Sequence, residues 1–374
     1  MEKIPFVIND LVLFEEFCNL KCQYCEGFCP SEYKFQIKDG RLVLPESWKT
    51  KVAQLGLKDQ IPENPNIDDL FDLGLEVARR TREVFDVTVL KLSGGEIFLN
   101  HHLIDFLRRI HSDYLAVQLL TNGTLFTERD IDLIAELENV YFQISLDHHN
   151  FERNRTRTDS PKLHQRVLRN ICYIQERNLG LEINCVITRT NIGGLGEFLS
   201  YLNKGNTIIF PRPVRGKPKE TLGAILEQLG TLKTILDNYD QYQEILPSRV
   251  YLEKVIELME SNQREQDCYV PFFVLGTNNY GQINTCTCSG ELPLIGSVFN
   301  LEDRAREHLS EQKQYNPKSR LRPCKDCINQ YGIFDLYVKG LISNDELVKI
   351  PTFQYPGVIE RTKAIKNKLL KTNR

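Results

Sequence analysis

The chain has 374 residues, of which 41% are hydrophobic and 26% are charged. These are the proportions of a globular protein that is large enough for more than one core, and they exclude a disordered chain, a collagen and a coiled coil. The 47 Lys and Arg residues nearly balance the 50 Asp and Glu residues. Net charge therefore attracts neither nucleic acid nor an anionic membrane, and we expect neither as a partner.

The chain also lacks the apolar segments of a membrane or secreted protein. No run approaches the ~18 apolar residues that span a bilayer, and Asn9 and Asp10 interrupt the N-terminal run before it reaches the length of a signal peptide. We therefore expect a cytoplasmic protein. Its eleven cysteines would then be reduced, and spaced cysteines in a reducing compartment usually bind metal or perform redox chemistry.

Residues 1–215 alternate β-rich runs with amphipathic stretches of helical period. Strands are predicted at 12–16, 87–93, 116–121, 140–146, 181–188 and 206–213. Helices are predicted between them, at 68–84, 101–111, 127–138, 160–178 and 192–204. Right-handed crossovers would curl these units into an α/β fold, a partial (βα)6 TIM-like barrel that binds ligands at the C-terminal ends of its strands.

The rest of the chain departs from this rhythm. A proline-containing stretch interrupts the barrel, two helices at 219–238 and 249–264 follow it, and a cysteine-bearing segment and a basic helical end complete the chain. The expected parts are a barrel at 1–215 with an insertion at 26–66, a helical connector at 216–264, a smaller cysteine-bearing domain at 265–340 and a basic tail at 341–374.

Three cysteines follow the first predicted strand in a C-x3-C-x2-C spacing: Cys18, Cys22 and Cys25. Three thiolates on one loop can hold three irons of a cubane cluster and leave the fourth iron open, whereas four thiolates would suit an electron carrier. A zinc site completed by Cys29, or a set of structural cysteines, is the alternative at this point.

The second predicted strand ends in Gly94-Gly95-Glu96. The two glycines allow close approach of a ligand to the backbone, and the Glu96 carboxylate can accept a hydrogen bond from an ammonium group. By itself such a motif is most often a turn. Next to the cysteine loop it is expected to form one wall of the same site.

The loop matches the C-x3-C-x-aromatic-C pattern of the radical S-adenosylmethionine (SAM) superfamily, which the sequence resembles over roughly residues 10–215. The resemblance implies a [4Fe-4S] cluster that binds SAM and cleaves it to a 5′-deoxyadenosyl radical, with an electron donor such as flavodoxin or ferredoxin. Arg157 is preferred over Arg153 and Arg155 for the SAM carboxylate, because a guanidinium can bind it with two bonds. The cofactor-binding positions implied are Tyr24, Gly94, Gly95, Glu96, Asn122, Ser145, Asp147, Arg157 and Asn191.

A second group of cysteines lies near the C-terminus: Cys268, Cys286, Cys288, Cys324 and Cys327. A glycine at position 281 fits the turn of a small hairpin that returns the chain toward the first of them. On the residues alone, a structural zinc site and an iron–sulfur site are equally supported.

Behind a radical SAM barrel, this spacing resembles the twitch subgroup, a shortened form of the SPASM domain. The resemblance implies one auxiliary [4Fe-4S] cluster on Cys268, Cys286, Cys324 and Cys327, and therefore two clusters in all. Cys288 is left over. It is a candidate hydrogen donor to a substrate radical, an alternative ligand in place of Cys286, or a packed bystander.

The function expected is hydrogen abstraction from an unactivated carbon, leading to a crosslink or a dehydrogenation in a ribosomally made peptide. The insertion or the basic tail would bind a leader sequence, or a separate leader-binding protein would do so. The alternatives are epimerisation, a sugar or aminocyclitol substrate, and a cluster-based redox sensor, although a sensor does not need a SAM site. Arg212 and Arg215, at the end of the sixth predicted strand, would face a carboxylate or phosphate on a small substrate.

Overall fold

The computed structural model describes residues 3–13, 18–25, 36–38, 41–43, 67–215, 219–284, 286, 295–301, 309, 324 and 327–372. Within them, the main feature is a nine-stranded sheet with the order β11-β10-β9-β1-β4-β5-β6-β7-β8. Six strands from the first part of the chain run parallel to one another. These are β1 (Ile4–Leu13), β4 (Phe85–Gly94), β5 (Ala116–Thr121), β6 (Val140–Ser145), β7 (Leu181–Ile187) and β8 (Thr207–Pro213).

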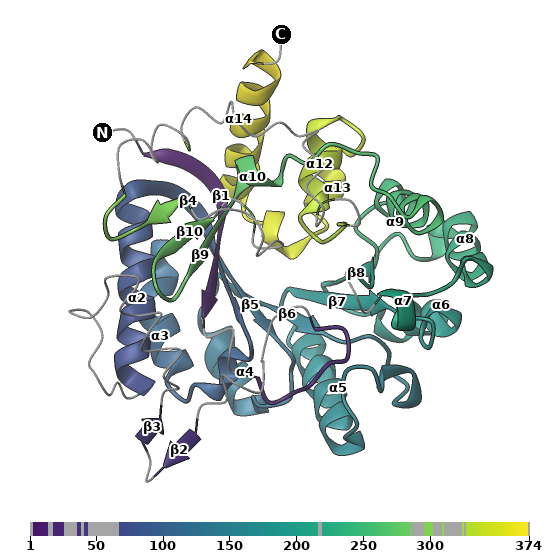
Figure 1. Ribbon diagram of the computed structural model, residues 1–374, viewed down its shortest axis with the longest axis horizontal. Coiled ribbons are helices and arrows are strands. Elements are labelled where there is room, and N and C mark those ends of the chain that lie inside the picture. Colours follow the sequence, from purple (N-terminus) through teal and green to yellow (C-terminus); the bar gives the residue numbers. More distant parts are fainter. Residues whose placement is uncertain are drawn as a thin grey trace.

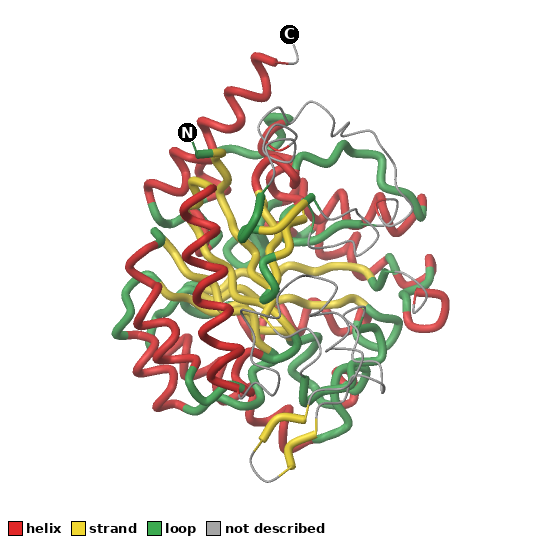
Figure 2. The backbone as a smooth tube through the Cα atoms, turned by 60° about the vertical axis from the view of Figure 1, so that its left-hand side comes forward, coloured by secondary structure: helices red, strands yellow, loops and turns green. Residues whose placement is uncertain are grey.

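Helices alternate with these strands and lie around the outside of the sheet (Figures 1 and 2). They are α2 (Ile67–Val84), α3 (Leu103–Ile110), α4 (Glu128–Ala135), α5 (Pro161–Glu176) and α6 (Leu195–Leu202). Two of them begin where the sequence provides caps, because the Thr127 and Ser160 side chains accept from backbone N–H groups of the first turns of α4 and α5. The predicted α/β fold with six parallel strands is confirmed.

The first strand corrects the sequence prediction, because it spans Ile4–Leu13 and not 12–16. Asn9 and Asp10 interrupt the apolar pattern that would indicate a buried strand, yet both side chains are buried. Asn9 accepts a hydrogen bond from Thr277 Oγ1 (2.8 Å) on a neighbouring strand. Buried polar groups are tolerated when they are paired, and these partners come from distant parts of the chain.

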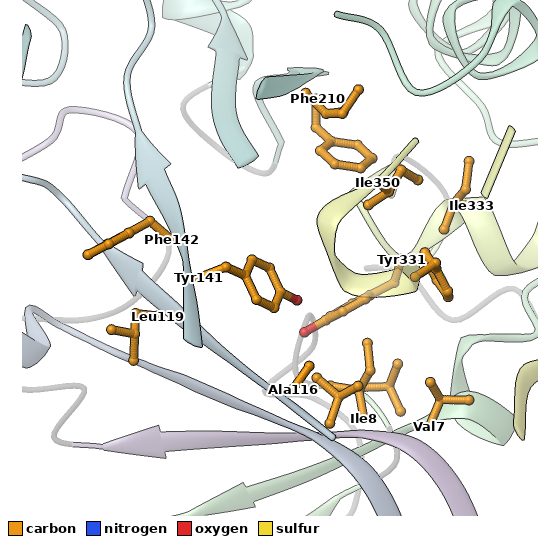
Figure 3. Packing of buried hydrophobic residues seen from close by; sticks show 14 of the residues in the cluster. Val7, Ile8, Ala116, Leu119, Tyr141, Phe142, Phe210, Tyr331, Ile333 and Ile350 are labelled. Carbon is orange, nitrogen blue, oxygen red and sulfur yellow. The ribbon is translucent and has the colours of Figure 1, made fainter. Parts of the chain in front are cut away.

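Asp10 belongs to a polar network in the interior of the fold. Its carboxylate accepts hydrogen bonds from Ser93 Oγ and Tyr331 Oη, each at 2.6 Å. The Lys91 ammonium lies 4.0 Å from the same carboxylate and 4.9 Å from the centre of the Tyr331 ring. Figure 3 shows Tyr331 extending from the C-terminal segment toward Tyr141 of β6. The C-terminal segment is therefore fastened to the core by specific polar contacts.

The connector is helical but divided. Its helices are α7 (Lys219–Leu222), α8 (Gly230–Asp237) and α9 (Arg249–Ser261). The predicted helix at 219–238 is wrong as one element, since the chain breaks between α7 and α8, where Gly223 and Gly230 lower helix propensity. The second helix ends near its predicted limit, with Asn262 in the left-handed conformation (φ 56°).

The cysteine-bearing segment continues the sheet of the barrel. Strand β9 (Val274–Asn278) pairs in parallel with β1, and β10 (Gln282–Asn284) and β11 (Gly296–Ser297) add antiparallel strands beyond it. The predicted hairpin turn is present, with Gly281 at φ 73°, a conformation that favours glycine. Helix α9 contacts β8, α12 (Gly332–Val338) contacts α9, and α10 (Val270–Phe273) joins α12 to β1. These helices connect the two ends of the six-stranded barrel sheet.

The C-terminal end forms α13 (Asn344–Leu347) and the long helix α14 (Pro356–Thr372), which contacts β1 and β4 (Figure 1). Val358, Thr362, Ile365 and Leu369 of α14 are buried, so one side of this basic helix is packed. Of the insertion, the structure describes only a hairpin of β2 (Gln36–Lys38) and β3 (Arg41–Val43). Within the described part of the chain, no helix is long and apolar enough to cross a membrane.

Candidate active site

The cysteine loop, residues 18–25, lies beyond the C-terminal end of β1 and is held from two neighbouring segments. Asn122, just after β5, donates to Asn19 Oδ1 (2.8 Å), and its Nδ2 lies 3.8 Å from Cys18 Sγ. The Gln23 N–H donates to the Thr156 carbonyl (2.8 Å) in the segment after β6. Residues far apart in sequence thus fix where the loop presents its thiols.

A cavity of about 250 Å³ lies beside this loop. Its wall includes Cys22, Tyr24 and Cys25 from the loop and Ser145 at the end of β6. Burial raises the pKa of Cys22 to about 11; Arg157 opposes this shift, whereas the thiols of Cys25 and Cys18 add to it. A positively charged group such as a bound iron would favour the thiolate form of these cysteines.

The wall also holds Arg157, Arg212, Arg215 and Ile328. No Asp or Glu is among the described residues that line it. The sequence prediction that Arg212 and Arg215 face a ligand site is consistent with this position, and so is the choice of Arg157. The cavity is therefore suited to a ligand that carries a carboxylate or another anionic group.

Asp147 organises one side of the cavity. Its buried carboxylate accepts hydrogen bonds from Tyr24 Oη, from Arg157 Nη2 (2.9 Å) and from the Val186 N–H (2.9 Å). The Arg157 guanidinium also lies 5.4 Å from the centre of the Tyr24 ring. Asp147 thus positions Tyr24 and Arg157. The buried Nε of Arg157 has no partner among the described residues.

Gly94 and Glu96 lie where β4 ends. A Cβ on Gly94 would come within 1.7 Å of the Leu13 carbonyl oxygen, so the neighbouring strand β1 requires glycine there. The buried Glu96 carboxylate accepts hydrogen bonds from Thr121 Oγ1 and from the Asn122 N–H, both at 2.6 Å. Burial raises the pKa of Glu96. Here Glu96 connects the ends of β4 and β5 and is engaged by protein donors.

Asn191 is likewise engaged by the protein. Its Nδ2 donates to the carbonyls of Val186 (2.8 Å) and Asp147 (3.2 Å), and its Oδ1 accepts from the Thr188 N–H (2.8 Å). The side chain therefore fastens the end of β7 to the segment after β6. A direct contact of Asn191 with a cofactor stays a prediction.

Two members of the second cysteine group, Cys268 and Cys327, lie near a buried ion pair. Arg264 pairs with Asp335 on α12 and donates to the Cys327 carbonyl oxygen (3.1 Å). Burial raises the pKa of Cys268, and Cys327 adds to this effect, so the two thiols are neighbours. Arg215 Nη1 donates to Cys327 Sγ (3.2 Å). This connects the second cysteine group to the wall of the cavity.

The remaining cysteines of this group are Cys286 and Cys324, which are half-buried, while Cys288 lies outside the described residues. Among the residues that the structure describes, no three His, Cys, Asp or Glu side chains converge on one point as ligands of a single metal ion. A cubane cluster distributes its cysteines over separate irons, so it does not require that convergence. An N–H donor close to the sulfur of Cys327 is compatible with a thiolate that binds metal.

The contacts around the second cysteine group could not be predicted from the sequence. The Arg264–Asp335 pair joins residues 71 positions apart, and the Arg215–Cys327 contact spans 112. Neither has a local sequence signal. For Tyr24 and Asp147, the sequence indicated a shared site, but it did not indicate that they contact each other.

Residues 12–201, just over half of the chain, match the family model of the radical SAM superfamily. No curated protein matches the sequence. Among solved structures, anSMEcpe with bound AdoMet is similar over 97% of this chain and 100% of its own (14% identity, TM-score 0.55). Streptococcus suis SuiB bound to S-adenosylmethionine is similar over 86% of this chain and 72% of its own (14% identity, TM-score 0.54).

Proposed function

Because this chain belongs to the radical SAM superfamily, we propose that it uses SAM and two [4Fe-4S] clusters to oxidise a peptide. Cys18, Cys22 and Cys25 would hold the cluster that binds SAM. Cys268, Cys286, Cys324 and Cys327 would hold an auxiliary cluster. When bound, the first cluster supplies the electron that cleaves SAM and yields a 5′-deoxyadenosyl radical, which takes hydrogen from the substrate.

One observation carries this proposal: a single cavity is lined by cysteines of the first group and by Arg215, which contacts Cys327 of the second group. Its wall contains Cys22 and Cys25, and also Arg215 and Ile328, the residue that follows Cys327. A substrate in this cavity would lie close to the place where a radical is made and to a centre that can accept an electron. That arrangement favours oxidation.

The protein's own groups would orient the ligands. The Arg157 guanidinium, which lines the cavity, is proposed to bind the SAM carboxylate, while Asp147 holds it in place. Ser145 is half-buried on the cavity wall and is proposed to face the ribose or the substrate. Gly94 allows the close approach of β4 to β1, and its contact with the cofactor remains part of the proposal.

A peptide is the favoured substrate because two proteins of similar fold have been solved with one. Streptococcus suis SuiB has been solved bound to the precursor peptide SuiA, and anSMEcpe with AdoMet and the Cp18Cys peptide. The basic helix α14 is packed against the sheet on one side. If this helix binds a leader, only its exposed Lys and Arg side chains are available for that role.

Iron counting tests the two-cluster proposal directly. After anaerobic reconstitution we expect about eight iron and eight sulfide per chain. Replacing Cys18, Cys22 and Cys25 together by Ala should leave about four iron and abolish formation of 5′-deoxyadenosine with a reductant. Cys172→Ala, on α5 and away from the cavity wall, is the matched control and should keep eight. Zinc with four iron in the unmodified protein would refute the auxiliary cluster.

Product analysis separates oxidation from epimerisation. A hydrogen donor such as the one proposed at Cys288 would return hydrogen to the substrate, and in D₂O the product would carry deuterium without a change in oxidation state. We expect instead a product that is two hydrogens lighter. Deuterium incorporation that disappears in Cys288→Ala, with iron content retained, would favour epimerisation.

A further inference from the structure

The contact between Arg215 and Cys327 joins two regions with separate tasks. Arg215 lies just beyond the end of β8, lines the cavity, and donates through Nη1 to Cys327 Sγ (3.2 Å). Cys327 is buried and Arg215 is half-buried, so the sulfur end of this bond is shielded from water. The guanidinium therefore lies between a substrate in the cavity and the second cysteine group.

Other groups near Cys327 act differently. Arg264 donates to the backbone carbonyl oxygen of Cys327, and its charge is offset by its ion-pair partner Asp335. Asn329 Nδ2 is 3.9 Å from the sulfur and carries no charge. Arg215 makes a short, charge-assisted bond to this sulfur, and such bonds are the strong ones.

We propose that Arg215 is a positioning residue that holds the Cys327 thiolate and raises the reduction potential of the auxiliary cluster. This rests on the proposed function, because it requires a cluster on Cys327. A reduced cluster carries one more negative charge than the oxidised one, so a cationic donor on its ligand stabilises the reduced form more. Hydrogen bonds to cluster sulfurs are known to set such potentials.

The location of Arg215 gives this effect a role in the reaction. A higher potential makes the centre a better electron acceptor, and the side chain that raises it borders the substrate cavity. Arg215 would therefore favour oxidised over redox-neutral products. Arg212 lines the same cavity but donates to Gln330 Oε1 (3.3 Å), and it provides a matched comparison.

Redox titration followed by EPR tests the proposal on the full chain with both clusters reconstituted. Arg215→Met should lower the midpoint potential of one cluster by about 59 mV, which corresponds to a tenfold loss in the equilibrium constant for one-electron reduction. Arg215→Lys, which retains the charge, should shift it less. Arg212→Met should shift it by less than half as much as Arg215→Met, and the other cluster should be unaffected.

Each alternative outcome has a distinct meaning. Unchanged midpoints in Arg215→Met with about eight iron retained would overturn the proposal. A fall to four iron in both Arg215 variants would also overturn it, because Arg215 would then be needed for assembly of the centre. If the unmodified protein contains four iron or zinc, the proposed function itself fails, whatever the Arg215 variants do.

Discussion

Replacing Gly94 by Ala tests how tightly the end of β4 is packed against β1. The added Cβ would lie 1.7 Å from the Leu13 carbonyl oxygen and 2.8 Å from its carbon, both rigid backbone atoms. Gly94 also has φ 157°, which residues with a Cβ seldom adopt. Overpacking costs about 1–3 kcal/mol and an unfavourable backbone conformation about 1–3 kcal/mol. We therefore expect Gly94→Ala to lower the free energy of unfolding by about 2–6 kcal/mol.

Thermal unfolding under anaerobic conditions, followed by circular dichroism, measures this loss. At about 2 °C per kcal/mol for a large domain, the midpoint should fall by roughly 4–12 °C. Gly230→Ala is the control, because a Cβ there meets no atom within 4 Å and the residue begins helix α8; it should be neutral or slightly stabilising. Equal midpoints for Gly94→Ala and Gly230→Ala would refute the reasoning.

Three further predictions concern buried polar contacts. Burial lowers the pKa of His148 to about 4, so unfolding takes up a proton below pH 6.5 and the free energy of unfolding should fall between pH 6.5 and pH 4. His148→Gln should reduce this pH dependence. The same pH dependence in the variant and the unmodified protein would contradict the prediction. Tyr331→Phe leaves the Asp10 carboxylate without one donor and should cost about 1.5–3 kcal/mol; a denaturation midpoint equal to that of the unmodified protein would contradict this. Asn122→Ala removes the side-chain amide next to Cys18. It should lower the iron retained by Cys18, Cys22 and Cys25 and leave the four irons of the auxiliary cluster in place. If all eight irons stay bound during gel filtration, the Asn122 side chain is not needed.

Much of the barrel was predictable because its signals are local. The predicted strand at 116–121 has the same bounds as β5 (Ala116–Thr121). The other predicted strands lie within a few positions of the observed ones, except the first. The first strand, β1, differs from its predicted position because Asn9 and Asp10 are polar. Hydrogen bonds from Thr277, Ser93 and Tyr331 allow these two side chains to be buried in a strand. Partners so distant along the chain leave no local pattern.

For the site, the sequence by itself determined which residues could carry the chemistry, because the spacing of Cys18, Cys22 and Cys25 is a property of a single loop. Only the tertiary structure decided what each side chain contacts. It engaged Glu96 and Asn191 with protein donors and acceptors, and it brought Arg215 to Cys327. The reason is physical: spacing along a loop is fixed by the backbone, whereas contacts between strand ends depend on the register and curvature of the whole sheet.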